Sequence, residues 1–453
     1  MEYVLVSDKD NVKVCLDNGH KYAVRDIQKG EQVIKYGFPI GVACEDIKQG
    51  EHIHSHNLKT ALSGTLEYSY SPDFEYPEST EPAVINAYER KNGDIGIRND
   101  IWIVPTVGCV NSIAKSLADK TGAFCFTHPY GCSQLGGDLE VTQKVLSGIV
   151  KHPNAGGVLV LGLGCENNNI AEFKKALGEY DEERIRFLNC QDCDDEMTEG
   201  VRLITELQSL AENDIRTSVP ISRLKIGLKC GGSDGLSGIT ANPLCGRITD
   251  RLVSMGGTAV LTEVPEMFGA EQILMNRCVD ENVFGDTVSL INNYKEYFIS
   301  HNQPVSENPS PGNKEGGITT LEEKSLGCVQ KGGTALVTAV LDYGDTAEKS
   351  GLNLLNGPGN DMVAVTNLTA ASCHLILFTT GRGTPLGAPV PTIKIATNSA
   401  IAERKKNWID FDAQSGNEYA LFDLIIQTAN GKQTKNEQYG YREIAIFKDG
   451  VTL

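Results

Sequence analysis

Cysteine, histidine and carboxylate side chains recur in this chain directly after short apolar runs, usually beside glycine. Segments of this form occur at residues 108–109, 128–132, 162–166, 230–234 and 263–266. Glycine lets the backbone approach a ligand closely, while thiols, imidazoles and carboxylates bind metals or transfer protons. If the apolar runs are parallel strands, these segments lie where α/β proteins bind ligands, at the carboxyl ends of the strands. The recurrence therefore favours an active site over ordinary turns.

Candidate catalytic side chains lie in these segments and in two later loops. His128 or Glu166 could take a proton from a substrate, and the sequence does not rank the two. Asp234, in the run CGGSD, is a third candidate. Lys314, in NPSPGNKEGG, and Arg382, between two glycines, could bind an anionic substrate. A guanidinium on a bare backbone can hold a carboxylate through two hydrogen bonds, so Arg382 is the stronger candidate for binding.

Three histidines alternate along one extended segment. His52, His54 and His56 would project from the same face of a strand, so their imidazoles could reach a common ligand. This arrangement is typical of a metal site. An exposed edge strand that carries polar side chains is the alternative interpretation.

Three strand-end cysteines offer a second candidate metal site. Cys109, Cys132 and Cys165 could hold iron directly, as in dehydratases that bind an iron–sulfur cluster. The alternative is that they are three buried small hydrophobic residues. The chain has 13 cysteines, an odd number that favours free thiols or metal ligands over disulfides in a reducing compartment.

No organic cofactor is expected. The run GLGCEN follows an apolar stretch and begins like a dinucleotide-binding fingerprint, but its sixth position is Asn167 instead of glycine. No acidic residue stands at the expected distance, and a phosphate-binding Walker A sequence is absent.

Composition and charge narrow the class of protein. A net charge of −18 argues against nucleic acid or an anionic membrane as partner. A small anionic substrate is still possible if a few basic residues converge on it. The apolar runs are too short to span a bilayer, and the first residues do not resemble a secretory signal. We expect a cytoplasmic protein, with a homo-oligomer left open.

The elements that must position these residues form two kinds of structure. Residues 1–68 contain short strands separated by glycine turns, which predicts a small all-β domain. Residues 69–83 are rich in proline, serine and acidic residues and read as a linker. From residue 84, apolar runs alternate with amphipathic stretches, which predicts a doubly wound, mainly parallel α/β region. We place its two lobes at residues 84–300 and 301–453.

Long motifs resemble the altronate/galactarate dehydratase family over essentially the whole chain. They include GEHIHSHN (50–57), GIRNDIWIVPTVGCVN (96–111), YGCSQLG (130–136), CGGSDGLSGITANP (230–243), TEVPEMFGAEQ (262–272), NPSPGNKEGGITTLEEKSLG (308–327) and FTTGRGTP (378–385). The resemblance implies an N-terminal SAF-type, β-clip-like domain, a large dehydratase region, and a requirement for Fe2+ or Mn2+.

Within that family, the H-x-H-x-H-N run and PEMFGAEQ resemble the branch that acts on altronate. The resemblance therefore implies dehydration of D-altronate to 2-keto-3-deoxy-D-gluconate in hexuronate catabolism. Galactarate or another sugar acid is an alternative substrate. A sulfolactate sulfo-lyase and a non-catalytic protein that binds sugar acids are further alternatives.

Overall fold

Short strands form two small antiparallel sheets at the N-terminus of the computed structural model, which describes residues 2–62, 64–76 and 78–453. One sheet contains β1 (Tyr3–Val4), β2 (Val12–Cys15), β3 (Lys21–Ala23) and β6 (His52–Ile53), and the other contains β4 (Gln32–Lys35), β5 (Phe38–Ala43) and β7 (Leu58–Lys59). Apolar side chains such as Val12, Val33, Ile40 and Ile53 are buried between them. The alternation of these side chains with polar ones is what allows each strand to bury only one face.

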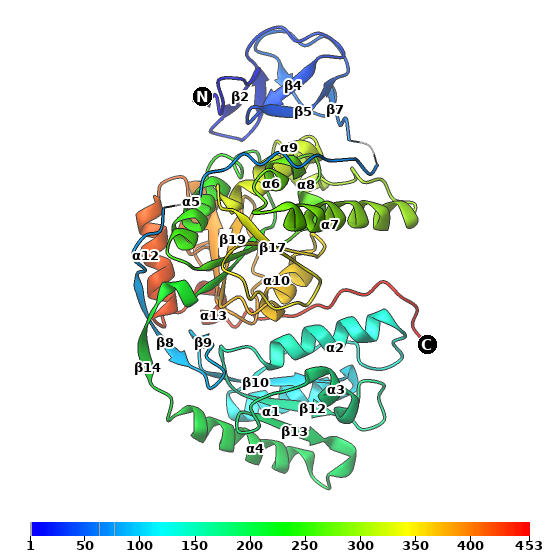
Figure 1. Ribbon diagram of the computed structural model, residues 1–453, viewed down its shortest axis with the longest axis vertical. Coiled ribbons are helices and arrows are strands. Elements are labelled where there is room, and N and C mark those ends of the chain that lie inside the picture. The colour runs from blue at the N-terminus through cyan, green and yellow to red at the C-terminus, as the bar shows by residue number, and fades with distance from the viewer. Residues whose placement is uncertain (1, 63, 77) are drawn as a thin grey trace.

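The next segment, residues 60–83, crosses the surface of the large region without a helix or strand among its described residues. It is held by side chains: the Tyr68 hydroxyl donates to Glu271 at 2.6 Å, and the Tyr70 hydroxyl donates to the Cys278 carbonyl at 2.8 Å. Figure 1 shows it running beneath the N-terminal domain along the large region.

A four-stranded parallel sheet forms the far end of the molecule (Figure 1). Its strand order is β11 (Phe124–Cys125), β10 (Asp100–Pro105), β12 (Ala155–Gly162) and β13 (Ile185–Asn189). Helices α1 (Asn111–Thr121) and α4 (Glu196–Ala211) pack together, as do α2 (Gly137–Val150) and α3 (Ile170–Leu177). A small antiparallel sheet of β14 (Arg216–Pro220), β8 (Val84–Glu89) and β9 (Ile95–Gly96) accompanies it.

The largest sheet has seven strands, all parallel. Their order is β17 (Val337–Leu341), β18 (Gly351–Leu355), β16 (Thr258–Leu261), β15 (Lys225–Cys230), β19 (Leu375–Thr380), β20 (Thr392–Ala396) and β21 (Phe411–Asp412). Its helices are α5 (Ala241–Ser254), α6 (Glu271–Met275), α7 (Glu281–Ser300), α8 (Pro311–Glu315), α9 (Leu321–Cys328), α10 (Asp361–Ala370), α11 (Ser399–Arg404), α12 (Glu418–Ala429) and α13 (Lys435–Gln438). Strands on both sides of residue 300 therefore share one sheet. The predicted class, a β domain followed by a parallel α/β region, is confirmed.

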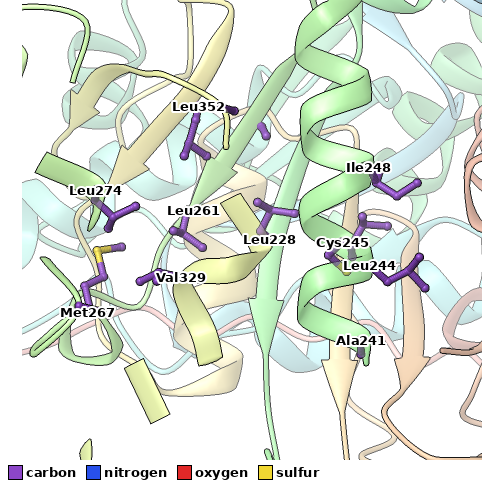
Figure 2. Close-up of a cluster of buried hydrophobic side chains, with 14 of the residues drawn as sticks. Leu228, Ala241, Leu244, Cys245, Ile248, Leu261, Met267, Leu274, Val329 and Leu352 are labelled. Atoms are coloured by element: carbon purple, nitrogen blue, oxygen red, sulfur yellow. The ribbon is translucent and has the colours of Figure 1, made fainter. Parts of the chain in front are cut away.

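Helix α5 fixes the centre of this sheet. Its apolar residues recur at helical spacing, and Figure 2 shows Ala241, Leu244, Cys245 and Ile248 near Leu228 of β15. All of these side chains are buried. Burial of an aliphatic side chain of this size contributes about 1.5–3 kcal/mol. The packing holds the carboxyl end of β15 in place, where Cys230 lies.

Strand β15 is the point at which the sheet order changes direction. The chain leaves β15 through α5 to its neighbour β16 on one side, whereas β19 pairs with β15 on the other side. Loops that leave in opposite directions open a crevice above the strand ends. No helix among the described residues is long and apolar enough to cross a membrane.

Candidate functional site

A cavity of about 1020 Å³ opens at the carboxyl ends of β15 and β19, at this change of direction. The cavity lining includes Cys230, Glu266, Asn313, Lys314, Lys324, Asp361 and Arg382. These residues come from several loops that are distant in sequence, so only the folded chain brings them together. The lining carries both signs of charge, which suits a hydroxylated acid better than an apolar ligand.

Two thiols and one carboxylate meet at the floor of the cavity. Cys230 Sγ lies 3.2 Å from Cys328 Sγ, and the two thiols lie 3.1 Å and 3.0 Å from Glu266 Oε2. All three residues are buried, and their ligand atoms lie within 4.8 Å of one another. Among the described residues of the chain, this is the group of three that could hold a metal ion.

Buried ion pairs surround this group. Lys324 Nζ lies 2.7 Å from Glu266 Oε1, and Lys331 Nζ lies 3.3 Å from Glu263 Oε2. Lys229 is fully buried; it donates to Glu263 and lies 3.0 Å from Asp361 Oδ1. Each of these buried charges thus has a partner of opposite sign, whose attraction offsets part of the cost of burying it.

The two glutamates have opposite pKa shifts. Burial, together with the negative charge of Glu266, raises the pKa of Glu263. Burial would also raise the pKa of Glu266, but the Lys324, Lys229 and Lys331 ammonium groups outweigh it and hold that pKa well below the usual range. Glu263 also has a left-handed backbone, with φ of 72°. Such strain in a non-glycine residue is typical of functional sites.

Two of the predicted binding residues line this cavity. Arg382 has a side chain that is 44% exposed, and its Nη2 lies 2.9 Å from Glu315 Oε2. Lys314 lies in the facing loop, in the short helix α8. Asp234 lies behind the lining: it accepts hydrogen bonds from Thr397 at 2.9 Å and from Asn398 at 3.2 Å. It thereby joins the loops that follow β15 and β20.

The two predicted bases belong to the four-stranded sheet. His128 is buried, donates from Nε2 to the Pro105 carbonyl at 2.8 Å and accepts from the Tyr130 amide at 3.2 Å. Glu166 is buried as well and accepts from the Thr106 hydroxyl at 2.8 Å and from the Leu163 amide at 3.0 Å. Neither is among the described residues that line the cavity at β15 and β19.

The three predicted histidine ligands lie together on the N-terminal domain, with His20 as a fourth. The rings of His54 and His56 lie with their centroids 5.6 Å and 5.8 Å from that of His52. His20 Nδ1 lies 3.0 Å from His52 Nε2, because β3 pairs with β6. No three of these described rings place a nitrogen each within 4.8 Å of the others, so a shared ion would require side-chain rotation.

Partial burial favours the neutral form of three of these imidazoles, because it lowers their pKa values. Burial, together with the neighbouring His20 and His54, lowers the pKa of His52 to about 4. Burial also lowers the pKa values of His20 and His54. Because a neutral imidazole is the form that binds metals, this chemistry fits a metal site.

The histidine face contacts the loop that lines the cavity. His54 Nε2 donates to the Lys314 carbonyl at 2.8 Å. Nearby, Lys21 donates to the Gly317 carbonyl at 3.0 Å and to the Thr319 hydroxyl at 2.5 Å. The N-terminal domain is therefore docked against the same segment that forms one wall of the cavity.

The alternative metal ligands Cys109, Cys132 and Cys165 are all exposed. The interpretation that they are three buried hydrophobic residues is therefore wrong. Each lies between a strand of the four-stranded sheet and the helix that follows it, Cys109 in a short 3-10 helix, Gly108–Val110. Their sulfur atoms do not all lie within 4.8 Å of one another.

Sequence reasoning did not select the cavity residues Glu266, Lys324 and Asp361, nor Cys328, which contacts Cys230, nor His20, which contacts His52. Glu266 lies in a strand-end segment, so a signal for it was present. Cys328 ends helix α9 and has no such signal. His20 directly precedes β3, and it could have been found by pairing β3 with β6, which begins at His52.

Family models match three consecutive parts of the chain. The model described as "Altronate/galactarate dehydratase SAF domain" matches residues 2–61. "D-galactarate dehydratase/Altronate hydrolase, second domain" matches residues 87–212, and "D-galactarate/Altronate dehydratase, C-terminal" matches residues 221–452. The chain belongs to the altronate/galactarate dehydratase family.

Relatives within the family differ in how similar they are to this chain. It is 51% identical to an altronate dehydratase of Escherichia coli, with 100% of both chains covered. It is 53% identical to an altronate dehydratase of Bacillus subtilis, over 99% of this chain and 94% of the relative. Identity to a galactarate dehydratase of Escherichia coli is 30%, over 98% and 96% of the two chains.

Proposed function

We propose that this chain removes water from D-altronate to give 2-keto-3-deoxy-D-gluconate, a step of hexuronate catabolism. The observation that carries the proposal is its identity of 51% and 53% to two altronate dehydratases along the full chain. The galactarate dehydratase, at 30%, makes a dicarboxylate the second candidate. A sulfolactate sulfo-lyase and a non-catalytic binding protein are weaker candidates.

The cavity at β15 and β19 is the proposed substrate site. Arg382 and Lys314, on facing loops, would bind the substrate carboxylate. The polar floor would bind the hydroxyl groups. Lys324, whose side chain is 7% exposed, pairs with Glu266, the carboxylate that both thiols contact.

Asp361 is our proposed base for the proton next to the carboxylate. It is a carboxylate of the cavity lining whose side chain is 35% exposed, and Lys229 orients it from below at 3.0 Å. Lys324 would protonate the departing 3-hydroxyl, because its ammonium faces the same cavity. His128 and Glu166 remain predictions from the sequence and would act only on a substrate that reaches the four-stranded sheet.

We further propose a requirement for Fe2+ or Mn2+. A divalent ion would offset the negative charge that develops beside the carboxylate when the neighbouring proton leaves. His52, His54 and His56 would hold it, joined by His20, because burial favours the neutral form of His20, His52 and His54 and because His54 contacts the Lys314 loop. The buried group of Cys230, Glu266 and Cys328 is the competing holder.

An anaerobic assay for 2-keto acid with Fe2+ tests the proposal on altronate, galactarate and sulfolactate in parallel. We expect keto acid from altronate, and much less from galactarate. Release of sulfite from sulfolactate would favour the sulfo-lyase. Binding of altronate by calorimetry without any product would identify a non-catalytic protein.

A further inference from the structure

Three Gly-Cys pairs lie in the segments that follow three neighbouring strands of the four-stranded sheet. Cys109 follows β10, Cys132 lies in the loop after β11, and Cys165 follows β12. These strands are adjacent and parallel, in the order β11, β10, β12. Their loops therefore emerge at the same edge of the sheet.

Backbone hydrogen bonds join the three loops into one unit. The Gly108 amide donates to the Tyr130 carbonyl at 2.9 Å, and the Asn168 amide donates to the Gly131 carbonyl at 2.9 Å. The Ser133 amide also donates to Asn167 Oδ1 at 2.8 Å. The cysteine of each loop is thus held at a defined place relative to the others.

The glycine before each cysteine is required by this packing. A Cβ atom on Gly131 would lie 2.0 Å from the Thr106 carbonyl oxygen, and one on Gly108 would lie 2.9 Å from the His128 carbonyl oxygen. Gly131 and Gly164 have φ angles of 99° and 131°, which side chains rarely allow. The backbones of the Cys109 and Cys132 loops can approach each other only because Gly108 and Gly131 carry no side chain.

The three thiols differ from most cysteines of the chain because they are exposed, whereas seven others are buried. Exposed thiols on rigid neighbouring loops are available to an external ligand. The Gln191 side chain donates to Cys165 Sγ at 3.6 Å, and the Ser133 hydroxyl lies 3.9 Å from Cys132 Sγ.

We propose that Cys109, Cys132 and Cys165 bind an iron–sulfur cluster. Their sulfurs do not meet the 4.8 Å spacing of ligands around a single ion. In a four-iron cluster each thiolate binds a different iron, so its ligands are spread further apart than those of a single ion. Each thiol releases its proton on binding, and three thiolates leave one iron of a four-iron cluster open to a ligand from outside the protein.

The proposal is independent of altronate dehydration, because cluster binding is measured without substrate. The full chain is reconstituted anaerobically with iron, sulfide and dithiothreitol and then desalted. Iron, acid-labile sulfide, visible absorption and the electron paramagnetic resonance of the reduced protein are recorded. The single variants Cys109→Ala, Cys132→Ala and Cys165→Ala are compared with Cys125→Ala, which changes a half-buried cysteine of the same domain.

We expect wild type and Cys125→Ala to hold several irons and equal sulfide per chain. Each of the three other variants should lose at least half of both. The triple variant His52→Ala, His54→Ala, His56→Ala should keep its sulfide, which separates the cluster from iron on the histidines. Circular dichroism confirms that each variant is folded.

Two results would overturn the proposal. In the first, the wild-type protein binds iron or zinc but contains no labile sulfide. That result would mean that these loops bind a single metal ion or no metal at all. The other is a set of folded cysteine variants with wild-type sulfide content.

Discussion

The carboxylate of Glu323 lies 2.8 Å from the ammonium of Lys21, with both side chains at most 1% exposed. Lys35 approaches the same carboxylate from the second small sheet at 2.9 Å. One buried glutamate of helix α9 therefore forms ion pairs with two lysines of the N-terminal domain. This contact places the histidines of that domain beside the loop that lines the cavity.

Replacement Glu323→Gln should destabilise the protein strongly, because it leaves two buried ammonium groups without a counter-charge. Breaking a buried pair in this way costs about 3–5 kcal/mol. Urea unfolding measures the loss, and limited proteolysis within residues 60–83 reports on undocking of the N-terminal domain. Glu31→Gln, which removes the exposed pair with Arg25, is the matched control and should change stability by less than about 1 kcal/mol. Equal stability of the two variants would contradict the docking role.

Acid should weaken the same contact. Burial alone would raise the pKa of Glu323, but Lys21 and Lys35 lower it from 4.5 to about 2. A carboxyl with a depressed pKa stabilises the folded state fully above its unfolded value, and this contribution is lost as the pH falls. We expect stability to decline from about pH 4.5 towards pH 2. The decline should be smaller in Glu323→Gln, and an identical acid profile in the two proteins would refute this assignment.

Replacement Arg382→Ala should reduce kcat/KM for altronate, since it removes a charge-assisted hydrogen bond to the carboxylate. The expected loss is roughly tenfold to a hundredfold. Steady-state kinetics measure it, and Arg382→Lys should restore part of the rate. Arg202→Ala, on the exposed face of α4, is the control and should be neutral. An unaltered kcat/KM for Arg382→Ala would show that Arg382 does not bind the substrate carboxylate.

The triple variant His52→Ala, His54→Ala, His56→Ala should lose the iron that the histidines bind, which is iron in excess of the labile sulfide. It should also lose its dehydratase activity. Metal analysis after anaerobic loading and desalting measures the content. His301→Ala changes a histidine far along the chain that pairs with Asp449, so it should keep wild-type metal. If the triple variant keeps its iron and Cys328→Ser loses it, the buried cysteine and glutamate group is the metal site.

Replacement Asp361→Asn should lower kcat for altronate by about 10²–10⁴, the usual contribution of a positioned general base. Asp423→Asn, on the outer face of α12, is the control. Binding of altronate, followed by calorimetry, should persist in Asp361→Asn. A kcat close to that of wild type would require another base, and Glu166→Gln and His128→Gln would then be measured.

Part of the site was predictable because strand ends carry a local signal. Cys230 and Glu266 lie in segments that follow apolar runs, and Arg382 lies between two glycines. Cys328 could not be predicted in this way, because it ends a helix and meets Cys230 across 98 residues. His20 joins His52 through antiparallel pairing across 32 residues, which alternation within one strand does not reveal.

The sequence by itself determined the types of element and their order, because hydrophobic periodicity and turn residues act over a few neighbouring positions. It also placed reactive side chains at the carboxyl ends of parallel strands. Only the tertiary structure decided which strands share a sheet, and therefore that His128 and Glu166 belong to one sheet and Cys230 to another. The tertiary structure likewise decided which buried lysine pairs with which glutamate, because packing brings together charged side chains from segments far apart in the chain.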